Sequence, residues 1–231
     1  MDGDANGGAI SIVDSANVVI DACRIEGNGC KTTGSSAVGH ARGGGVYVSG
    51  GPLTITGSLI RRNWLSAGAK SESLCYGAGI CSLRSDVTVL DSEIEQNYVK
   101  QSVGRSACGG GIYAIGTDAS NYNTLLMKGC LVADNSIQAS GPMLHDRLHG
   151  DGITCSSYMN LMLEEVTVAN NGRNYPQNYS GKFCSSGILT EDKNNYRGLT
   201  NVVVCGHAYN QSNVYGSTEK SRNVVNTATF T

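Results

Sequence analysis

The sequence predicts an all-β solenoid, made by stacking about six similar coils of short strands. Three observations predict this class. A phrase of the form I-x-x-N recurs at a nearly constant interval, the apolar residues around it alternate with a period of two, and no segment shows a helical period of 3.6 residues. Glycine is frequent, at 31 of 231 residues, and proline is rare, at 3, which suits short strands joined by tight turns.

The residue that closes the phrase sets the repeat. It occurs at intervals of 35, 34, 38, 36 and 36 residues, at Asn28, Asn63, Asn97, Asn135, Asn171 and His207. A fixed period of this size is typical of a stacked repeat. We expect the column to form a ladder at a bend, in which stacked amides bind one another and the nearby backbone, with His207 as a variant last rung.

Each coil is expected to contain two or three short strands, two bends and one long loop. The first strand follows a glycine cluster, and its inward positions are Ile10, Val46, Ile80, Ile112, Ile153 and Ile188. The second strand precedes the phrase, and its inward pairs include Val18 and Ile20, Leu53 and Ile55, and Val87 and Val89. A step of three residues to the next column, which holds Cys23, Ser58, Ser92, Cys130, Val166 and Val202, breaks the alternation and predicts a bend.

Stacking places like residues above like, with parallel pairing between coils. Because a single coil cannot bury its own inward face, the stack supplies the core. The sequence therefore predicts a right-handed parallel β-helix, one domain over residues 1–231 with coils of about 36 residues and long loops on one side. Since the chain begins within a coil, we expect it to be a segment of a longer protein.

These columns resemble the pectin-lyase-like β-helix superfamily over about residues 5 to 210. The pairing of GGxI with I-x-x-N is similar to the repeats of bacterial polymorphic outer-membrane proteins and related adhesins. Those repeats usually have Phe where this chain has Ile or Val. The resemblance implies a β-helical protein with an adhesive role at a cell surface.

The stretch HDRLHGDGITC holds the catalytic candidates. Asp151 occupies a column that is otherwise mostly glycine, and Arg147 and His149 precede it in a long loop. A carboxylate beside His and Arg can serve acid–base chemistry on a sugar chain. GDGI also resembles part of an aspartate motif of polygalacturonase-type hydrolases, with Glu165 among the acids that follow. The alternative is a polar loop that closes on a turn.

No cofactor is predicted. There is no pair of CxxC motifs to hold zinc. Four acids in one coil, Asp86, Asp91, Glu93 and Glu95, offer oxygen ligands that suit calcium, as the weaker alternative. Exposed acids on strand faces otherwise keep a β-rod in solution.

The nine cysteines and the charge bear on location and partners. Cys75 and Cys108 occupy nearly equivalent sites in neighbouring coils and are the predicted disulfide. Loop cysteines, with the sequons at Asn178 and Asn210, favour an extracellular or cell-surface protein. A net charge of −2 with only 16% charged residues indicates no nucleic-acid partner, and no apolar run reaches the roughly 20 residues of a membrane span.

The long loops are the predicted binding face. They cover 29–42, 64–76, 98–108, 136–149 and 172–185, and leave the same point of every coil. They carry the aromatic residues Trp64, Tyr76, Tyr98, Tyr175 and Tyr179. Such rings stack on sugars or anchor proteins, or else they cover the bases of the loops.

Two functions follow from these observations. The first is a structural or adhesive segment of an extracellular or cell-surface β-helical protein, which binds a polysaccharide or a surface protein through loops on one face. Its further partners would be flanking coils or copies in end-to-end contact. The alternative is a carbohydrate-active enzyme, a polysaccharide lyase or glycoside hydrolase, that acts on an acidic polysaccharide.

Overall fold

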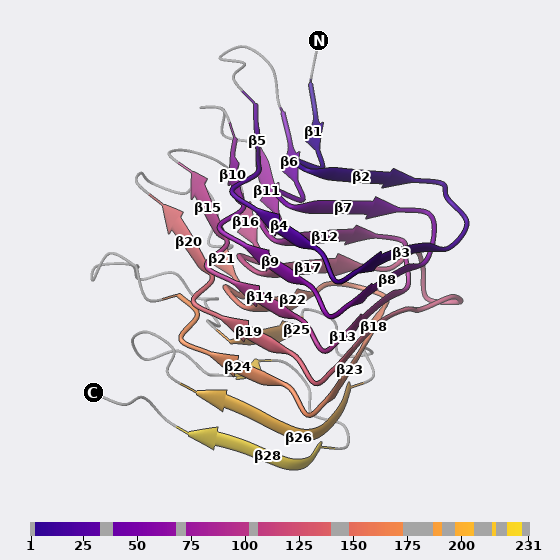
Figure 1. The fold of residues 1–231 in the computed structure, drawn as a ribbon, viewed down its shortest axis with the longest axis vertical. Helices are drawn as coiled ribbons and strands as arrows, with labels where there is room; N and C mark the ends of the chain where they lie inside the picture. Colours follow the sequence, from indigo (N-terminus) through magenta and orange to yellow (C-terminus); the bar gives the residue numbers. More distant parts are fainter. Residues whose placement is uncertain are drawn as a thin grey trace.

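The chain is a parallel β-solenoid, in which successive turns stack along one axis (Figure 1). The computed structural model describes residues 3–32, 39–67, 73–101, 106–139, 148–172, 187–190, 197–205, 214–215 and 221–227. Every regular element in these ranges is a strand, and every pairing between strands is parallel. The prediction of an all-β solenoid is therefore confirmed. In the described ranges, no helix is long and apolar enough to cross a membrane.

One turn contains five strands. The first turn has β1 (Ala5–Asn6), β2 (Ile10–Val13), β3 (Val18–Asp21), β4 (Arg24–Glu26) and β5 (Gly29–Lys31). The second has β6 (Ala41–Arg42), β7 (Val46–Ser49), β8 (Leu53–Thr56), β9 (Leu59–Arg61) and β10 (Trp64–Ser66). The third has β11 (Leu74–Tyr76), β12 (Ile80–Leu83), β13 (Val87–Leu90), β14 (Glu93–Glu95) and β15 (Tyr98–Gln101). The fourth has β16 (Ser106–Cys108), β17 (Ile112–Ile115), β18 (Asn123–Lys128), β19 (Leu131–Ala133) and β20 (Ser136–Ala139).

Four turns are thus complete within the described residues, rather than the six that the repeat count predicts. The stack continues with β21 (Leu148–His149), β22 (Ile153–Cys155), β23 (Met159–Glu164) and β24 (Thr167–Ala169). Beyond these come β25 (Ile188–Thr190), β26 (Arg197–Cys205), β27 (Val214–Tyr215) and β28 (Ser221–Thr227). The nine-residue β26 pairs with both β23 and β24, so one continuous strand spans the corner that separates two strands in every earlier turn.

The strands form four sheets. Sheet A is β1-β6-β11-β16-β21, sheet B is β2-β7-β12-β17-β22-β25-β27, and sheet D is β5-β10-β15-β20. Sheet C has two arms, β3-β8-β13-β18-β23 and β4-β9-β14-β19-β24, which β26 joins. Apart from β1, sheets A and D lie in parts of the first four ranges predicted to be long loops. The residues after each Asn alternate outward and inward, and they add strands of two to four residues that were not predicted.

The main core lies between sheet B and the two arms of sheet C. The predicted inward columns fill it, and their middle members, such as Val46, Ile55, Ile80 and Ile94, are fully buried. A second, narrower core lies between sheets A and D. Its side chains are mostly small, and its members are Cys30, Ala41, Leu65, Ala67, Cys75, Ala78, Val99, Ala107 and Ile137. The first turn covers its core less completely, so Cys23, in a predicted inward column, is exposed.

The corners between strands recur at fixed places in the turn, because the backbone there enters the left-handed region. The corner before the Asn column has positive φ at Gly27, Arg62, Gln96, Asp134 and Asn170. The bend within sheet C has it at Ala22, Gly57, Asp91, Gly129, Glu165 and Asn201. This second set is the bend that the three-residue step predicts.

Candidate functional site

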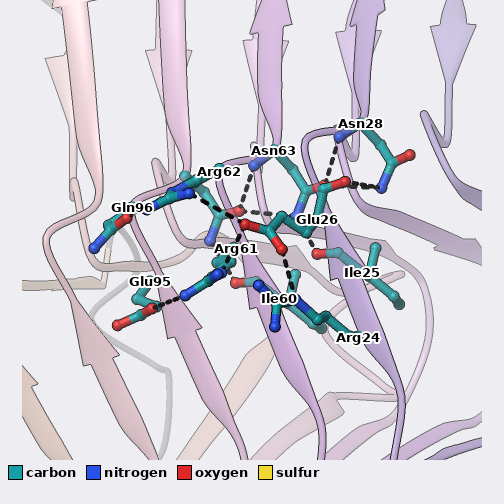
Figure 2. Close-up of polar contacts among 11 residues, drawn as sticks. Arg24, Ile25, Glu26, Asn28, Ile60, Arg61, Arg62, Asn63, Glu95 and Gln96 are labelled. Atoms are coloured by element: carbon teal, nitrogen blue, oxygen red, sulfur yellow. Dashed lines mark hydrogen bonds and ion pairs between the residues drawn. The ribbon is translucent and has the colours of Figure 1, made fainter.

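The asparagine column forms one continuous ladder along the solenoid (Figure 2 shows its first rungs). Asn63, Asn97, Asn135 and Asn171 have no exposed surface. The Nδ2 of Asn97 donates to Oδ1 of Asn135 at 3.0 Å and to the Ile60 carbonyl of the preceding turn at 2.9 Å. The other buried rungs repeat this pattern, so both ends of each amide are satisfied. His207 lies outside the described residues.

The hydrogen bonds between rungs all run in one direction, from a donor in one turn to an acceptor in the following turn. The backbone N–H of each rung also donates to the Oδ1 of the following rung, as Asn63 does to Asn97 at 3.0 Å. Serine side chains at the bend of sheet C do the same, since Oγ of Ser58 accepts from the N–H of Cys23 and Oγ of Ser92 accepts from the N–H of Ser58, both at 3.0 Å. The serine rungs were not predicted, although their column was.

A glycine column packs against the amides and explains why GGxI and I-x-x-N occur together. A Cβ added to Gly45 would lie 3.0 Å from Nδ2 of Asn63 and 2.8 Å from the Gly79 carbonyl oxygen. Gly79 stands in the same relation to Asn97. Any larger side chain would push the rungs apart, so the two motifs form one structural unit.

The charged residues beside the ladder form a network across three turns (Figure 2). Glu26 contacts Arg24 at 2.5 Å, Arg61 at 2.9 Å and Arg62 at 3.3 Å. Arg61 continues to Glu95 at 3.6 Å. The hydrogen bond from Arg24, opposed by partial desolvation and aided by Arg61, holds the pKa of Glu26 below its ordinary value. These ion pairs therefore connect adjacent turns on the outer surface of the solenoid.

The four acids considered for calcium are spread around their turn. Glu95 contacts Arg61, and Oδ1 of Asp86 accepts a hydrogen bond from the Thr124 N–H at 2.8 Å. Asp91 and Glu93 are exposed, the first of them at a corner. Within the ranges that the structure describes, no group of three or more His, Cys, Asp or Glu side chains is placed to hold a metal ion.

The catalytic candidates do not converge in the described structure. Asp151 is only 1% exposed, and its Oδ1 accepts a hydrogen bond from the Ile137 N–H at 2.7 Å. Glu165 is exposed at the bend of sheet C, and strands β22 and β23 separate it from Asp151 along the turn. His149 lies in β21 with its side chain outside the described part, and Arg147 lies wholly outside it.

Asp151 has a structural partner within the fold. Strand β20 is the last strand of sheet D in the described ranges, and Ile137 lies within it. The Asp151 carboxylate therefore accepts a hydrogen bond at the edge of this sheet. The two interpretations of Asp151, as a catalytic acid or as part of a polar loop that closes on a turn, did not include this hydrogen bond, because the end of sheet D has no signal in the local sequence.

The predicted disulfide is wrong. Cys75 is in register with Ala107, and Cys108 is in register with Tyr76, so the two cysteines are offset by one residue. Neighbouring residues of a strand point to opposite faces. Cys75 is a free thiol in the core between sheets A and D, and Cys108 lies in another cluster. Burial raises the pKa of the Cys75 thiol to about 12.

That other cluster covers the outer face of sheet B and was not predicted. It contains Tyr47, Cys81, Cys108 and Tyr113. Tyr76 of sheet A packs on it, and its ring stacks on that of Tyr113 with centroids 4.4 Å apart. The signal was present in GVYV and GIYA, where both faces of the strand are apolar, which is typical of a strand buried on both sides.

The aromatic binding candidates separate into two groups. Trp64 and Tyr98 lie on the outer face of sheet D, in register on adjacent turns, and both are partly exposed. Tyr76 belongs to the cluster outside sheet B, and Tyr175 and Tyr179 lie outside the described residues. The structure thus brings two of the five together on one surface.

No known family model matches the chain, and neither curated proteins nor solved structures show a significant match to it. The architecture alone therefore defines the class, a parallel β-solenoid with an internal amide ladder.

Proposed function

We propose that the chain is a structural or adhesive segment of an extracellular or cell-surface β-helical protein, of the pectin-lyase-like and adhesin-repeat kind, that binds glycan or protein. The single observation that carries this proposal is the pair Trp64 and Tyr98 on the outer face of sheet D. Flanking coils, or copies in end-to-end contact, would extend the rod.

The scaffold supports this role. The buried rungs of the asparagine column hydrogen-bond to one another and to the backbone, and Asp151 accepts at a sheet edge. These polar side chains have partners within the fold that account for their burial. What sheet D offers to the solvent is a regular surface with a repeated spacing, which suits an extended ligand better than a small one.

The two rings are suited to adhesion. They occupy equivalent positions on neighbouring strands, about 4.8 Å apart in the direction of the axis. Trp and Tyr combine a large apolar face with a polar edge, and are enriched at binding surfaces for that reason. A chain of sugar rings or an extended protein segment that runs along the axis would meet both.

The test is direct binding to a glycan array and to immobilised collagen and fibronectin. Trp64→Ala should weaken binding about tenfold or more, since truncation of a central aromatic anchor has effects of this size. Tyr122→Ala is the matched control, because Tyr122 is also partly exposed but contacts Tyr158 far along the turn from sheet D. Equal affinity of the Trp64 and Tyr122 variants, or no ligand on either panel, would contradict the proposal.

A further inference from the structure

Asparagine followed by glycine occurs three times in the chain, and the structure gives the three pairs different surroundings. The pairs are Asn6 and Gly7, Asn28 and Gly29, and Asn171 and Gly172. We propose that Asn28 is a site of spontaneous deamidation, at which the side-chain amide is lost through a cyclic imide with Gly29 and the first rung of the ladder becomes aspartate or isoaspartate. This inference concerns the ladder itself and does not depend on the proposed function.

The reaction requires that the backbone nitrogen after the asparagine be able to attack. That nitrogen gives up its proton to a base in solution and bonds to the side-chain carbon Cγ, and the Cγ–Nδ2 bond breaks to release ammonia. Water then adds to one of the two ring carbonyl carbons, which opens the ring to aspartate or isoaspartate. Glycine in the second position favours the attack, because it has no Cβ to hinder the approach. A hydrogen bond donated by the same N–H opposes it, because that bond must first be broken.

The N–H of Gly29 is directed away from the next turn. On either side of it, the N–H groups of Asn28 and Thr32 donate to Oδ1 of Asn63 and to the Ser66 carbonyl of the second turn. Backbone N–H groups along a strand alternate in direction, so that of Gly29 faces the opposite edge. In the described part of the chain β10 is the one neighbour of β5, and the Gly29 N–H therefore has no backbone partner there.

The other two pairs have this N–H engaged. The Gly172 N–H donates to the Asn135 carbonyl oxygen at 2.7 Å, and the Gly7 N–H donates to that of Arg42 at 3.0 Å. Along the ladder, the residue after each buried rung donates in the same way to the Asn carbonyl of the preceding turn. The attacking nitrogen is thus held in a hydrogen bond at two of the three pairs and released at the third.

The amide of Asn28 is also held less closely than that of a buried rung. Its Nδ2 donates to the Glu26 carbonyl and to Oδ1 of Asn63, both at 3.2 Å, and the residue is half-buried. Within the described ranges, its Oδ1 accepts no hydrogen bond. Oδ1 of Asn171, by contrast, accepts from both the N–H and Nδ2 of Asn135 at 3.0 Å, and the residue has no exposed surface. The Asn28 side chain therefore gives up less when it rotates towards the following nitrogen.

The modification would change the end of the ladder (Figure 2). An aspartate in place of Asn28 has no Nδ2 to donate to Asn63 or to the Glu26 carbonyl, and it adds a negative charge at a half-buried position. An isoaspartate also lengthens the backbone by one carbon, which shifts β5 against β10. The first turn should therefore loosen while the buried rungs stay in place.

The experiment is to age the full folded chain in mildly alkaline buffer and to follow the three pairs separately by peptide mapping and mass spectrometry. Conversion of amide to acid should be at least about tenfold faster at Asn28 than at Asn6 or Asn171, because the released N–H saves about one hydrogen bond in the barrier. The control is the same chain unfolded in guanidinium chloride, in which all three pairs should react at similar rates.

Two variants complete the test. Asn28→Gln should abolish the fast conversion, since the longer side chain does not close a five-membered ring, and it should leave the slow rates at Asn6 and Asn171 unchanged. Asn28→Asp should reproduce the melting temperature of the aspartate form that is isolated from aged protein. Equal rates at the three pairs in the folded chain would overturn the inference, and so would faster conversion at Asn6 or Asn171 than at Asn28.

Discussion

Single buried amides decide how the turns stay in register. Asn97 accepts from the N–H and Nδ2 of Asn63 and donates to Asn135 and to the Ile60 carbonyl, with no exposed surface. A buried amide that meets all its partners stabilises one alignment of the turns over any slipped one, because a slip would leave these groups unpaired. The asparagine column therefore helps to specify one alignment of the turns.

We predict that Asn97→Leu lowers the free energy of unfolding by about 1 to 3 kcal/mol for each buried hydrogen-bonding partner that it leaves unpaired. Asn28→Leu should have a smaller effect, since Asn28 is a half-buried end rung. Thermal and urea unfolding of both variants would measure the difference. Equal melting temperatures for Asn97→Leu and the parent chain would mean that the ladder is not a source of stability.

At the scale of strands, the sequence predicted the strands of sheets B and C but not the short strands of sheets A and D. In the four complete turns, the strands of sheets B and C are three to six residues long and carry large aliphatic side chains, so their period stands out. Sheets A and D have strands of two to four residues whose buried members are mostly small, such as Ala41, Cys75 and Ala107. Small side chains carry little contrast in hydropathy, so these strands read as loops.

The same limit applies to the candidate site. The positions of Trp64 and Tyr98 after the Asn column were visible, but their shared outer face required the strands of sheet D. Asp151 looked catalytic because an acid in a glycine column is unusual. Its hydrogen bond to Ile137 depends on where a sheet ends, which is a tertiary fact without a local signal.

The strands β4, β9 and β14 are also linked by charge, and this gives a pH-dependent prediction. Because the pKa of Glu26 is held below its ordinary 4.5, chiefly by Arg24, its ion pairs stabilise the fold above that pH and are lost as pH falls through the lowered pKa. Glu26→Gln should therefore lower the melting temperature near pH 7, and the difference should shrink as the pH falls below 4.5 and through the lowered pKa of Glu26.

Glu93→Gln is the matched control for this change. Glu93 is exposed on the same strand group and has no ion pair in the described part of the chain. Its substitution should have the same small effect on the melting temperature at neutral and at acid pH. A Glu26 effect that persists undiminished in acid would exclude the ion pairs as its cause.

For the whole molecule, stability should behave as a sum over turns, since each turn contacts only its neighbours. Removing residues 64–97, one complete period, would join Asn63 to Tyr98 and bring Asn63 beneath Asn135. We predict that this shortened chain folds with the same circular dichroism and an m-value lower by roughly 15%, in proportion to the 34 residues lost from 231.

Removing residues 64–80 instead takes away half a turn. The ladder and the inward columns would then fall out of phase, and we expect a chain that fails to unfold cooperatively. Denaturant titration of the two deletions, monitored by circular dichroism, separates the cases. Cooperative unfolding of both, or of neither, would contradict a modular stack.

One turn differs in length from its neighbours without disturbing them. Leu83 and Val87 are four residues apart, whereas their partners Ile115 and Leu125 are ten apart, so six residues are added at that corner. Asp118 closes the added segment by accepting from the N–H groups of Ser120 and Asn121, at 2.8 and 3.1 Å. The corner therefore accommodates extra residues, and a foreign peptide inserted there could be displayed while the solenoid beneath it keeps its spacing between turns.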